Sequence, residues 1–277
     1  MNAGSTKAER SEDSRFGFGR NWARYLALVN DERIALAEQS LMDMLERKSL
    51  DGLRFLDVGS GSGLFSLAAR NLGATVHSFD YDPDSVGCTQ VLRERYRPGD
   101  EGWVIERGDA LDRDYLEQLG EFDVVYSWGV LHHTGNMWQA LDNIVPLVKV
   151  GGGQLFVALY NDQRWLSKYW TQVKRFYNKG ILGRTAVIAS HAPYFIVRQA
   201  SKAILRPLLG HQAKRRGMDF WRDVIDWLGG YPFEVARPES VLAFYRKRGF
   251  TLERMTTVDG RHGCNEYVFH RTGSANR

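Results

Sequence analysis

Three glycines alternate with serines directly after a short apolar run, in the sequence Leu56-Asp57-Val58-Gly59-Ser60-Gly61-Ser62-Gly63. The apolar run over 53–58 predicts a buried strand, and residues 64–72 predict a helix that ends at Gly73. Glycine permits positive φ and lets the backbone come close to a ligand, while the helix that follows offers amide donors at its N-terminus. In a parallel sheet such a loop lies at the carboxyl ends of the strands, where ligands bind. The sequence therefore predicts a ligand-binding turn at that edge.

Apolar runs alternate with helical patterns along the chain. Strands are expected over 75–79, 103–106, 122–127 and 154–160, with a helix over 84–96; a later helix over 238–248 precedes strands over 251–258 and 266–270. This alternation predicts an α/β fold, a Rossmann-like seven-stranded sheet with helices on both faces, N-terminal helices and a helical insertion after the fifth strand. The expected domains are the N-terminal tail and helices (1–50), the core (51–160), the basic helical insertion (161–230) and the part that completes the core (231–277).

The glycine loop excludes two common phosphate-binding motifs. A dinucleotide fingerprint needs a third glycine three residues after the second, but Leu64 or Ser66 stands there, depending on the register. A P-loop needs Gly-Lys followed by Ser or Thr, which the chain lacks here. What remains is a GxGxG loop preceded by Asp57.

Charge is unevenly distributed along the chain. The 277 residues carry a net charge of +4, but residues 161–220 hold twelve Lys and Arg against only Asp162 and Asp219, so this segment is +10 and the rest is −6. Cys88 and Cys264 stand in no metal-ligand or disulfide pattern, so no metal site is expected. The N-terminal residues lack the apolar stretch of a secretory signal. We therefore expect a cytoplasmic protein, peripheral on the inner face of the membrane if the basic segment binds lipid.

Several motifs follow one another in a fixed order. After the glycine loop come Asp80 at the end of the second predicted strand, Gly108-Asp109-Ala110, the fourth strand with Ser127, and Val150-Gly151-Gly152-Gly153 before the fifth strand. With these motifs, residues 50–160 resemble the class I S-adenosylmethionine-dependent methyltransferases. The resemblance implies S-adenosylmethionine as cofactor, released as S-adenosylhomocysteine. It implies cofactor-binding roles for Asp57, Gly59, Ser60, Gly61, Gly63, Asp80, Tyr81, Asp109, Ala110 and Ser127. It also implies that the N-terminal helices within 1–50 form a helical lid over the cofactor, with cofactor-binding roles for Asn21 and Trp22.

The loop after the fourth strand bears on the methyl acceptor. Methylases of exocyclic amines carry Asn/Asp-Pro-Pro-Tyr there, whereas this chain has Ser127-Trp128-Gly129-Val130, which argues against amino groups of adenine or cytosine. His132 and His133 follow, and a histidine is a suitable base for an acidic hydroxyl such as a phenol. The alternative is that both histidines only pack or cap a helix. Tyr160 and Asn161 end the fifth strand on the ligand side and are expected to line the acceptor pocket.

The basic segment leaves the acceptor open. Its basic, aromatic-rich helices are typical of anionic membrane surfaces or acidic ligands, but a plain pocket cover fits as well, and nucleic acid fits least. The core is similar to ubiquinone-pathway O-methyltransferases, and two stretches around Tyr160 and Trp227 are similar to bacterial methyltransferases associated with surface-polysaccharide assembly. We therefore expect methyl transfer to a hydroxyl of a small or lipid-linked acceptor of the quinol or phenol type. The alternatives are a sugar or polyprenyl-linked glycan precursor, or a cofactor-binding module that transfers no methyl group and acts through its basic surface.

Overall fold

The computed structural model describes residues 26–208 and 220–273. Within these residues the chain divides into two compact units. The core comprises residues 26–164 and 234–273, and the helical unit comprises Trp165–Phe233.

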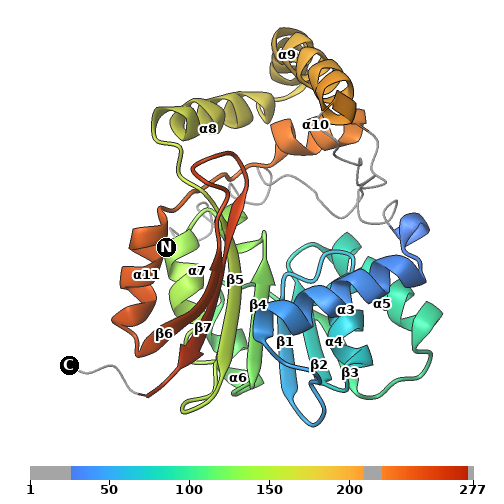
Figure 1. The fold of residues 1–277 in the computed structure, drawn as a ribbon, viewed down its shortest axis with the longest axis vertical. Coiled ribbons are helices and arrows are strands. Elements are labelled where there is room, and N and C mark those ends of the chain that lie inside the picture. The colour runs from blue at the N-terminus through green and yellow to red at the C-terminus, as the bar shows by residue number, and fades with distance from the viewer. Residues whose placement is uncertain (1–25, 209–219, 274–277) are drawn as a thin grey trace, which may run out of the picture. The chain divides into compact units, whose positions relative to one another are not determined.

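The core is built on one seven-stranded sheet (Figure 1). Its strands are β1 (Arg54–Val58), β2 (Thr75–Asp80), β3 (Trp103–Arg107), β4 (Val124–Trp128), β5 (Gln154–Tyr160), β6 (Phe250–Thr256) and β7 (Cys264–Arg271). The strand order is β3-β2-β1-β4-β5-β7-β6, in which β7 runs antiparallel to β5 and to β6, and the other pairs are parallel. The predicted seven-stranded Rossmann-like sheet is confirmed.

Helices cover both faces of this sheet, because neighbouring side chains of a strand point to opposite sides. Phe55 of β1 packs with the helices α3 (Asp31–Leu45), α4 (Leu64–Asn71) and α5 (Pro83–Tyr96). Leu56 and Val58 pack on the other side with α6 (Arg113–Leu119), α7 (Met137–Asn143) and α11 (Pro238–Arg246). Two short 3-10 helices, η1 (Leu26–Leu28) and η2 (Leu131–His133), complete the core elements of the described chain.

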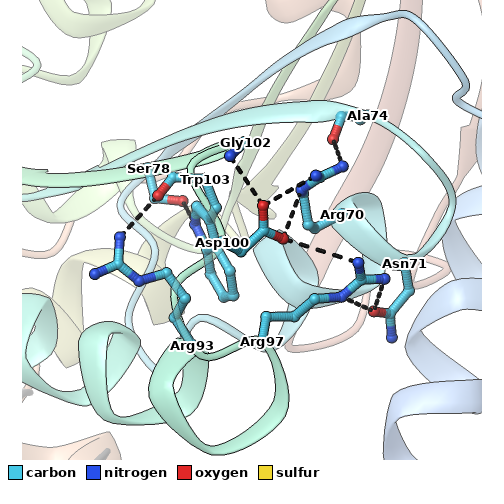
Figure 2. Close-up of polar contacts among 9 residues, drawn as sticks. All are labelled: Arg70, Asn71, Ala74, Ser78, Arg93, Arg97, Asp100, Gly102 and Trp103. Carbon is cyan, nitrogen blue, oxygen red and sulfur yellow. Dashed lines mark hydrogen bonds and ion pairs between the residues drawn. The ribbon is translucent and has the colours of Figure 1, made fainter.

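A network of charged side chains ties α4 and α5 to the start of β3 (Figure 2). The Arg70 guanidinium donates two hydrogen bonds to the Asp100 carboxylate, Nε to Oδ2 at 2.9 Å and Nη2 to Oδ1 at 3.0 Å. Arg97 lies 3.8 Å from the same carboxylate and also donates to Asn71. The arginine partners lower the pKa of Asp100. This network holds two helices and a strand in register at the edge of the sheet opposite the glycine loop.

The helical unit has its own aromatic centre. It consists of α8 (Trp165–Tyr177), α9 (Ile181–Leu208) and α10 (Phe220–Gly229). The ring of Trp170 on α8 lies 5.6 Å from that of His191 on α9 and 5.7 Å from that of Trp227 on α10. Lys174, one of the twelve basic residues of the segment over 161–220, is 1% exposed: its Nζ lies 3.7 Å from the Trp227 ring centroid and donates to the Trp227 carbonyl. Burial lowers the pKa of Lys174 to about 7.

The chain leaves the core for the helical unit and returns to it at one place, beside the end of β5. Asn161 and Ala236 form a parallel bridge, the Ala236 N–H donates to the Tyr160 carbonyl (2.9 Å), and the Asp162 N–H donates to the Ala236 carbonyl (3.1 Å). We call this pairing the stem. Among the helices of the described chain, none is long and apolar enough to cross a membrane.

Candidate active site

The glycine loop connects β1 to α4 at the point where the strand order reverses, between β1 and β4. Ligands of open α/β sheets bind at this switch point. Gly59, Gly61 and Gly63 have φ values of +84°, +55° and +79°, which other residues rarely adopt. The loop is held by the Gly59 and Ser60 amides, which donate to the Phe79 carbonyl, and by a 2.9 Å hydrogen bond between the Ser60 and Thr89 hydroxyls.

Asp80 ends β2 directly beside this loop. Its Oδ2 accepts the Gly61 N–H at 2.9 Å, and its Oδ1 accepts the Asp82 N–H at 2.9 Å. Burial raises the pKa of Asp80 to about 6, because these amide donors only partly replace the lost solvent. Among the ion pairs of the described residues none includes Asp80. The carboxylate is therefore a strong acceptor for hydroxyl donors that a ligand brings.

Asp57 lies beneath the loop and is 2% exposed. Its Oδ2 accepts the Ser66 hydroxyl at 2.5 Å; Ser66 accepts from Ser78 at 2.7 Å, and Ser78 accepts from the indole of Trp103 at 2.8 Å. Burial raises the pKa of Asp57 to about 7. This buried chain of donors places Asp57 as a support of the loop; its predicted contact with the cofactor stays a prediction.

The other predicted cofactor residues follow the neighbouring strands. Asp109 caps its own turn, with Oδ1 accepting the Leu111 N–H at 2.9 Å, and Ala110 is buried after it. The Tyr81 carbonyl accepts from Arg107 at 3.1 Å. The Ser127 hydroxyl is buried and donates to the Val58 carbonyl at 3.0 Å, so it joins β4 to β1. Their roles toward a ligand stay predictions, and Asn21 and Trp22 lie outside the described residues.

The predicted acceptor residues gather at the end of β5. The Tyr160 ring centroid lies 4.1 Å from that of His132 and 5.6 Å from that of His133. His132 is completely buried, and its Nδ1 accepts the backbone N–H of Tyr160 at 3.4 Å, so this nitrogen is already engaged in a hydrogen bond to the backbone. His133 is only partly buried. The geometry therefore favours His133 over His132 as the residue of the pair that faces a ligand.

Asn161 is nine-tenths buried, and both the nitrogen and the oxygen of its side-chain amide form hydrogen bonds to neighbouring residues. Its Nδ2 donates to the Arg261 carbonyl at 3.1 Å, and its Oδ1 accepts from Asn265 at 3.1 Å. These bonds fix the loop between β6 and β7. The predicted contact between Asn161 and the acceptor stays a prediction, while the loop that Asn161 holds adds a residue absent from the sequence prediction, His262.

The site residues suit S-adenosylmethionine in the chemistry of their atoms. Asp80 presents a carboxylate for a ribose diol, since each carboxylate oxygen can accept more than one hydrogen bond. The glycine loop presents backbone without side chains next to it. The part of the chain that the structure describes contains no group of three or more His, Cys, Asp or Glu side chains able to hold a metal ion.

Comparison with known proteins identifies the central part of the core. A family model described as a methyltransferase domain matches residues 56–153, which run from β1 to the turn before β5. This part of the chain is similar to methyltransferase domains. The predicted resemblance to the class I methyltransferases is thereby confirmed, and the loop and Asp80 both lie inside the matched methyltransferase domain.

Relatives match only part of the chain. The ubiquinone biosynthesis O-methyltransferase of Agrobacterium fabrum is 30% identical over 115 residues, which are 41% of this chain and 43% of that protein. The corresponding protein of Sinorhizobium medicae is 31% identical over 143 residues, 49% of this chain and 51% of that protein. The chain thus spans about half or less of the length of these curated relatives.

Solved structures support the fold. An O-methyltransferase family protein from Burkholderia thailandensis has a TM-score of 0.55 at 14% identity and covers 92% of this chain and 61% of its own. The cyclase SpnF has a TM-score of 0.52 at 14% identity and covers 87% of this chain and 81% of its own. A cyclase with this architecture illustrates that the fold of a methyltransferase domain does not by itself decide the reaction.

Proposed function

We propose that this chain is an S-adenosylmethionine-dependent methyltransferase that methylates a hydroxyl of a small or lipid-linked acceptor of the quinol or phenol type. The proposal is carried by the Asp80 carboxylate, which the Gly61 amide holds at the switch point of a methyltransferase domain. Support for a hydroxyl comes from Ser127-Trp128-Gly129-Val130 after β4 in place of an amine-methylase motif. The name of the Agrobacterium relative, an O-methyltransferase, points the same way.

The chain's own residues would bind and position the two reactants. Asp80 would accept hydrogen bonds from the ribose hydroxyls, the glycine loop would let the backbone approach the cofactor, and Asp109 would hold the adenine, as the resemblance implies. When bound, S-adenosylmethionine supplies an electrophilic methyl group. Holding the acceptor oxygen in line with that group accounts for much of the rate enhancement expected of such an enzyme.

The partner proposed for the helical unit is an anionic membrane surface. Trp165 is 74% exposed, and Ile181 and Leu182 are 81% and 87% exposed. The exposed basic residues Lys168 and Arg175 lie on the same helix as Trp165. Basic residues beside exposed apolar ones are typical of helices that lie in a lipid interface. A membrane surface also suits a lipid-linked acceptor.

The first test of the proposed function is cofactor binding. Calorimetric titration with S-adenosylmethionine at pH 7.5, where Asp80 is ionised, should show binding to the wild type. Asp80→Ala should weaken this affinity roughly 10- to 100-fold, because two charge-assisted hydrogen bonds are lost. Asp84→Ala, which removes an exposed carboxylate four residues away, is the matched control and should leave the affinity unchanged.

The second test is transfer of a labelled methyl group. Hydroquinone in solution and a polyprenyl quinol in vesicles are offered with labelled S-adenosylmethionine, and the methyl ether is identified by mass spectrometry. Product from either acceptor supports the proposal. Tight cofactor binding without product from phenols, but with product from nucleotide sugars, would replace the acceptor class by glycan precursors.

A further inference from the structure

His262 lies in the loop between β6 and β7, which reaches the same edge of the sheet as Tyr160. Because β7 runs antiparallel to β5, its first residue, Cys264, pairs with the last residue of β5, Tyr160. The hairpin of β6 and β7 therefore turns at the carboxyl ends of the parallel strands (Figure 1). There the ring of His262 stacks with that of Tyr160, with centroids 6.3 Å apart and planes 20° apart.

Gln163 fixes which nitrogen of His262 carries the proton. The Gln163 side-chain amide donates from Nε2 to the Gly260 carbonyl at 3.0 Å, so its Oε1 faces Nδ1 of His262 at 3.2 Å. An amide oxygen only accepts hydrogen bonds, so Nδ1 must be the donor. In the neutral ring the proton therefore stands on Nδ1, and Nε2 is the basic atom.

The loop around His262 is held in place by several hydrogen bonds. The backbone N–H of Asn161 donates to the Gly263 carbonyl at 2.9 Å, and its side-chain Nδ2 donates to the Arg261 carbonyl. Asn265 accepts the Val258 N–H at 3.0 Å, which closes the turn from the other side. A base that is held in one orientation and one tautomer loses little freedom when an acceptor arrives.

The two sequence-predicted histidines are placed differently. His132 is completely buried and its Nδ1 already accepts a backbone N–H. His133 is partly buried, with its ring centroid 5.6 Å from that of Tyr160. The His262 side chain is partly exposed as a whole, although its Nε2 atom is buried, and it combines a set tautomer with a place at the ligand edge.

We propose that His262 is the proton acceptor for the methylated hydroxyl and that Gln163 is its positioning residue. This inference rests on the proposed function. The acceptor O–H bond breaks and its proton moves to Nε2, the oxygen electron pair forms the new bond to the methyl carbon, and the pair of the carbon–sulfur bond stays on sulfur. The imidazolium then returns its proton to water.

Other titratable groups surround His262 and bear on its pH dependence. Tyr160 faces it from β5, with His132 and His133 beyond, and Arg261 and Cys264 flank it on its own hairpin. Burial holds the pKa of Tyr160 well above its usual range and raises that of Cys264 to about 12, so neither changes charge near neutral pH. The remaining groups near His262 that can change charge around neutral pH are His132 and His133. Substituting each histidine in turn separates its contribution to the pH dependence from that of His262.

The first measurement uses nitrogen NMR of the imidazole rings in the full-length protein. The wild type should show His262 as the Nδ1–H tautomer, assigned by comparison with His262→Asn. Gln163→Glu places a carboxylate at the same position and should keep His262 protonated to a pH higher by about one unit or more. An Nε2–H tautomer, or no change in Gln163→Glu, would overturn the role of Gln163.

The second measurement follows methyl transfer to hydroquinone against pH. His262→Asn should lower turnover at saturating acceptor by about 100-fold or more, while S-adenosylhomocysteine affinity stays within about twofold since the cofactor residues are untouched. His270→Asn, at the other end of β7 where His270 pairs with Gln154, is the matched control and should keep turnover within a few-fold. In Gln163→Glu the acidic limb of the pH profile should move to higher pH.

The outcomes separate this inference from the proposed function. Wild-type turnover that persists unchanged in His262→Asn overturns the proton-acceptor role while methyl transfer stands. A wild type that binds S-adenosylmethionine but methylates no hydroxyl compound overturns both the proposed function and the catalytic role of His262. The NMR tautomer still decides in that case whether Gln163 sets the basic nitrogen.

Discussion

Two separate features of the structure, the backbone conformation and a close neighbour, require a glycine at position 59. Its φ of +84° disfavours any side chain, and a Cβ at this position would lie 2.4 Å from Cγ1 of Val130. Val130 belongs to the loop after β4, so the close approach joins the β1 and β4 ends of the site. The glycine loop is thus shaped by its neighbour as well as by the ligand it is proposed to bind.

The two effects at Gly59 can be separated by substitution. Gly99→Ala introduces a Cβ at a φ of +69° in open space, so it should cost only the backbone strain of about 1–2 kcal/mol. Gly59→Ala should cost more than Gly99→Ala in urea unfolding, because it also displaces Val130. Adding Val130→Ala to Gly59→Ala should recover part of this difference. An equal loss of unfolding free energy in Gly59→Ala and Gly99→Ala would show that the Val130 side chain can move aside without an energetic cost.

The sequence predicted those site residues that belong to a local motif, and it did not predict those that depend on contacts between distant segments. Asp80 lies at the end of β2 beside the loop, where the motif order placed it. The hydrogen bond from Ser66 to Asp57 could not be predicted from the sequence, because it depends on a turn of α4 that packs under the glycine loop. His262 was missed because its partners, Tyr160 and Gln163, are about a hundred residues away in sequence. A histidine between glycines in a turn opposite a ligand-side strand end is the local signal that points to it.

At the scale of elements, the core strands and helices begin and end close to the predicted residues. The differences reach two residues, and one of them is at β7, which begins at Cys264, two residues before the predicted start. Cys264 and Asn265 pair with Tyr160 and Leu159 of β5, so the extra length comes from a partner strand that the apolar pattern of β7 alone does not reveal. Strand ends are set by pairing, and pairing is a property of the fold.

The Arg70–Asp100 pair gives the elements α4, α5 and β3 a measurable link. Asp100→Asn should lower the free energy of unfolding by about 1–3 kcal/mol at pH 7, since two hydrogen bonds to a charged, mostly buried acceptor are weakened. The folded state lowers the pKa of Asp100, so its stabilisation is present above the unfolded pKa of about 4 and is lost as pH falls through the folded value. The difference between wild type and variant should therefore shrink in urea titrations at pH 3. Asp114→Asn, on an exposed face of α6, is the control. A difference that is the same at pH 7 and pH 3 contradicts the assignment.

For the whole molecule, the separation of charge between the helical unit and the core gives the membrane proposal a direct test. Lys168→Gln with Arg175→Gln removes two exposed cations from α8 and should abolish salt-sensitive co-sedimentation with vesicles that contain anionic lipid. Arg246→Gln with Lys247→Gln removes the same charge from exposed positions at the end of α11 and should leave binding unchanged. Equal loss in both variants would indicate a general charge effect. Retained binding in the α8 variant would place the lipid contact elsewhere.

The stem also determines how this architecture can change over time. Residues Trp165–Phe233 leave the core and return to it across one short pairing, between Asn161 and Ala236, while the sheet on either side of it is complete. To the core, this excursion is a single loop with fixed ends, and the entropy of closing such a loop rises only slowly with its length. Lineages can therefore lengthen, shorten or exchange the excursion without redesigning the sheet. The same property makes the stem a natural splice point for building chimeras in which one catalytic core is combined with different recognition segments.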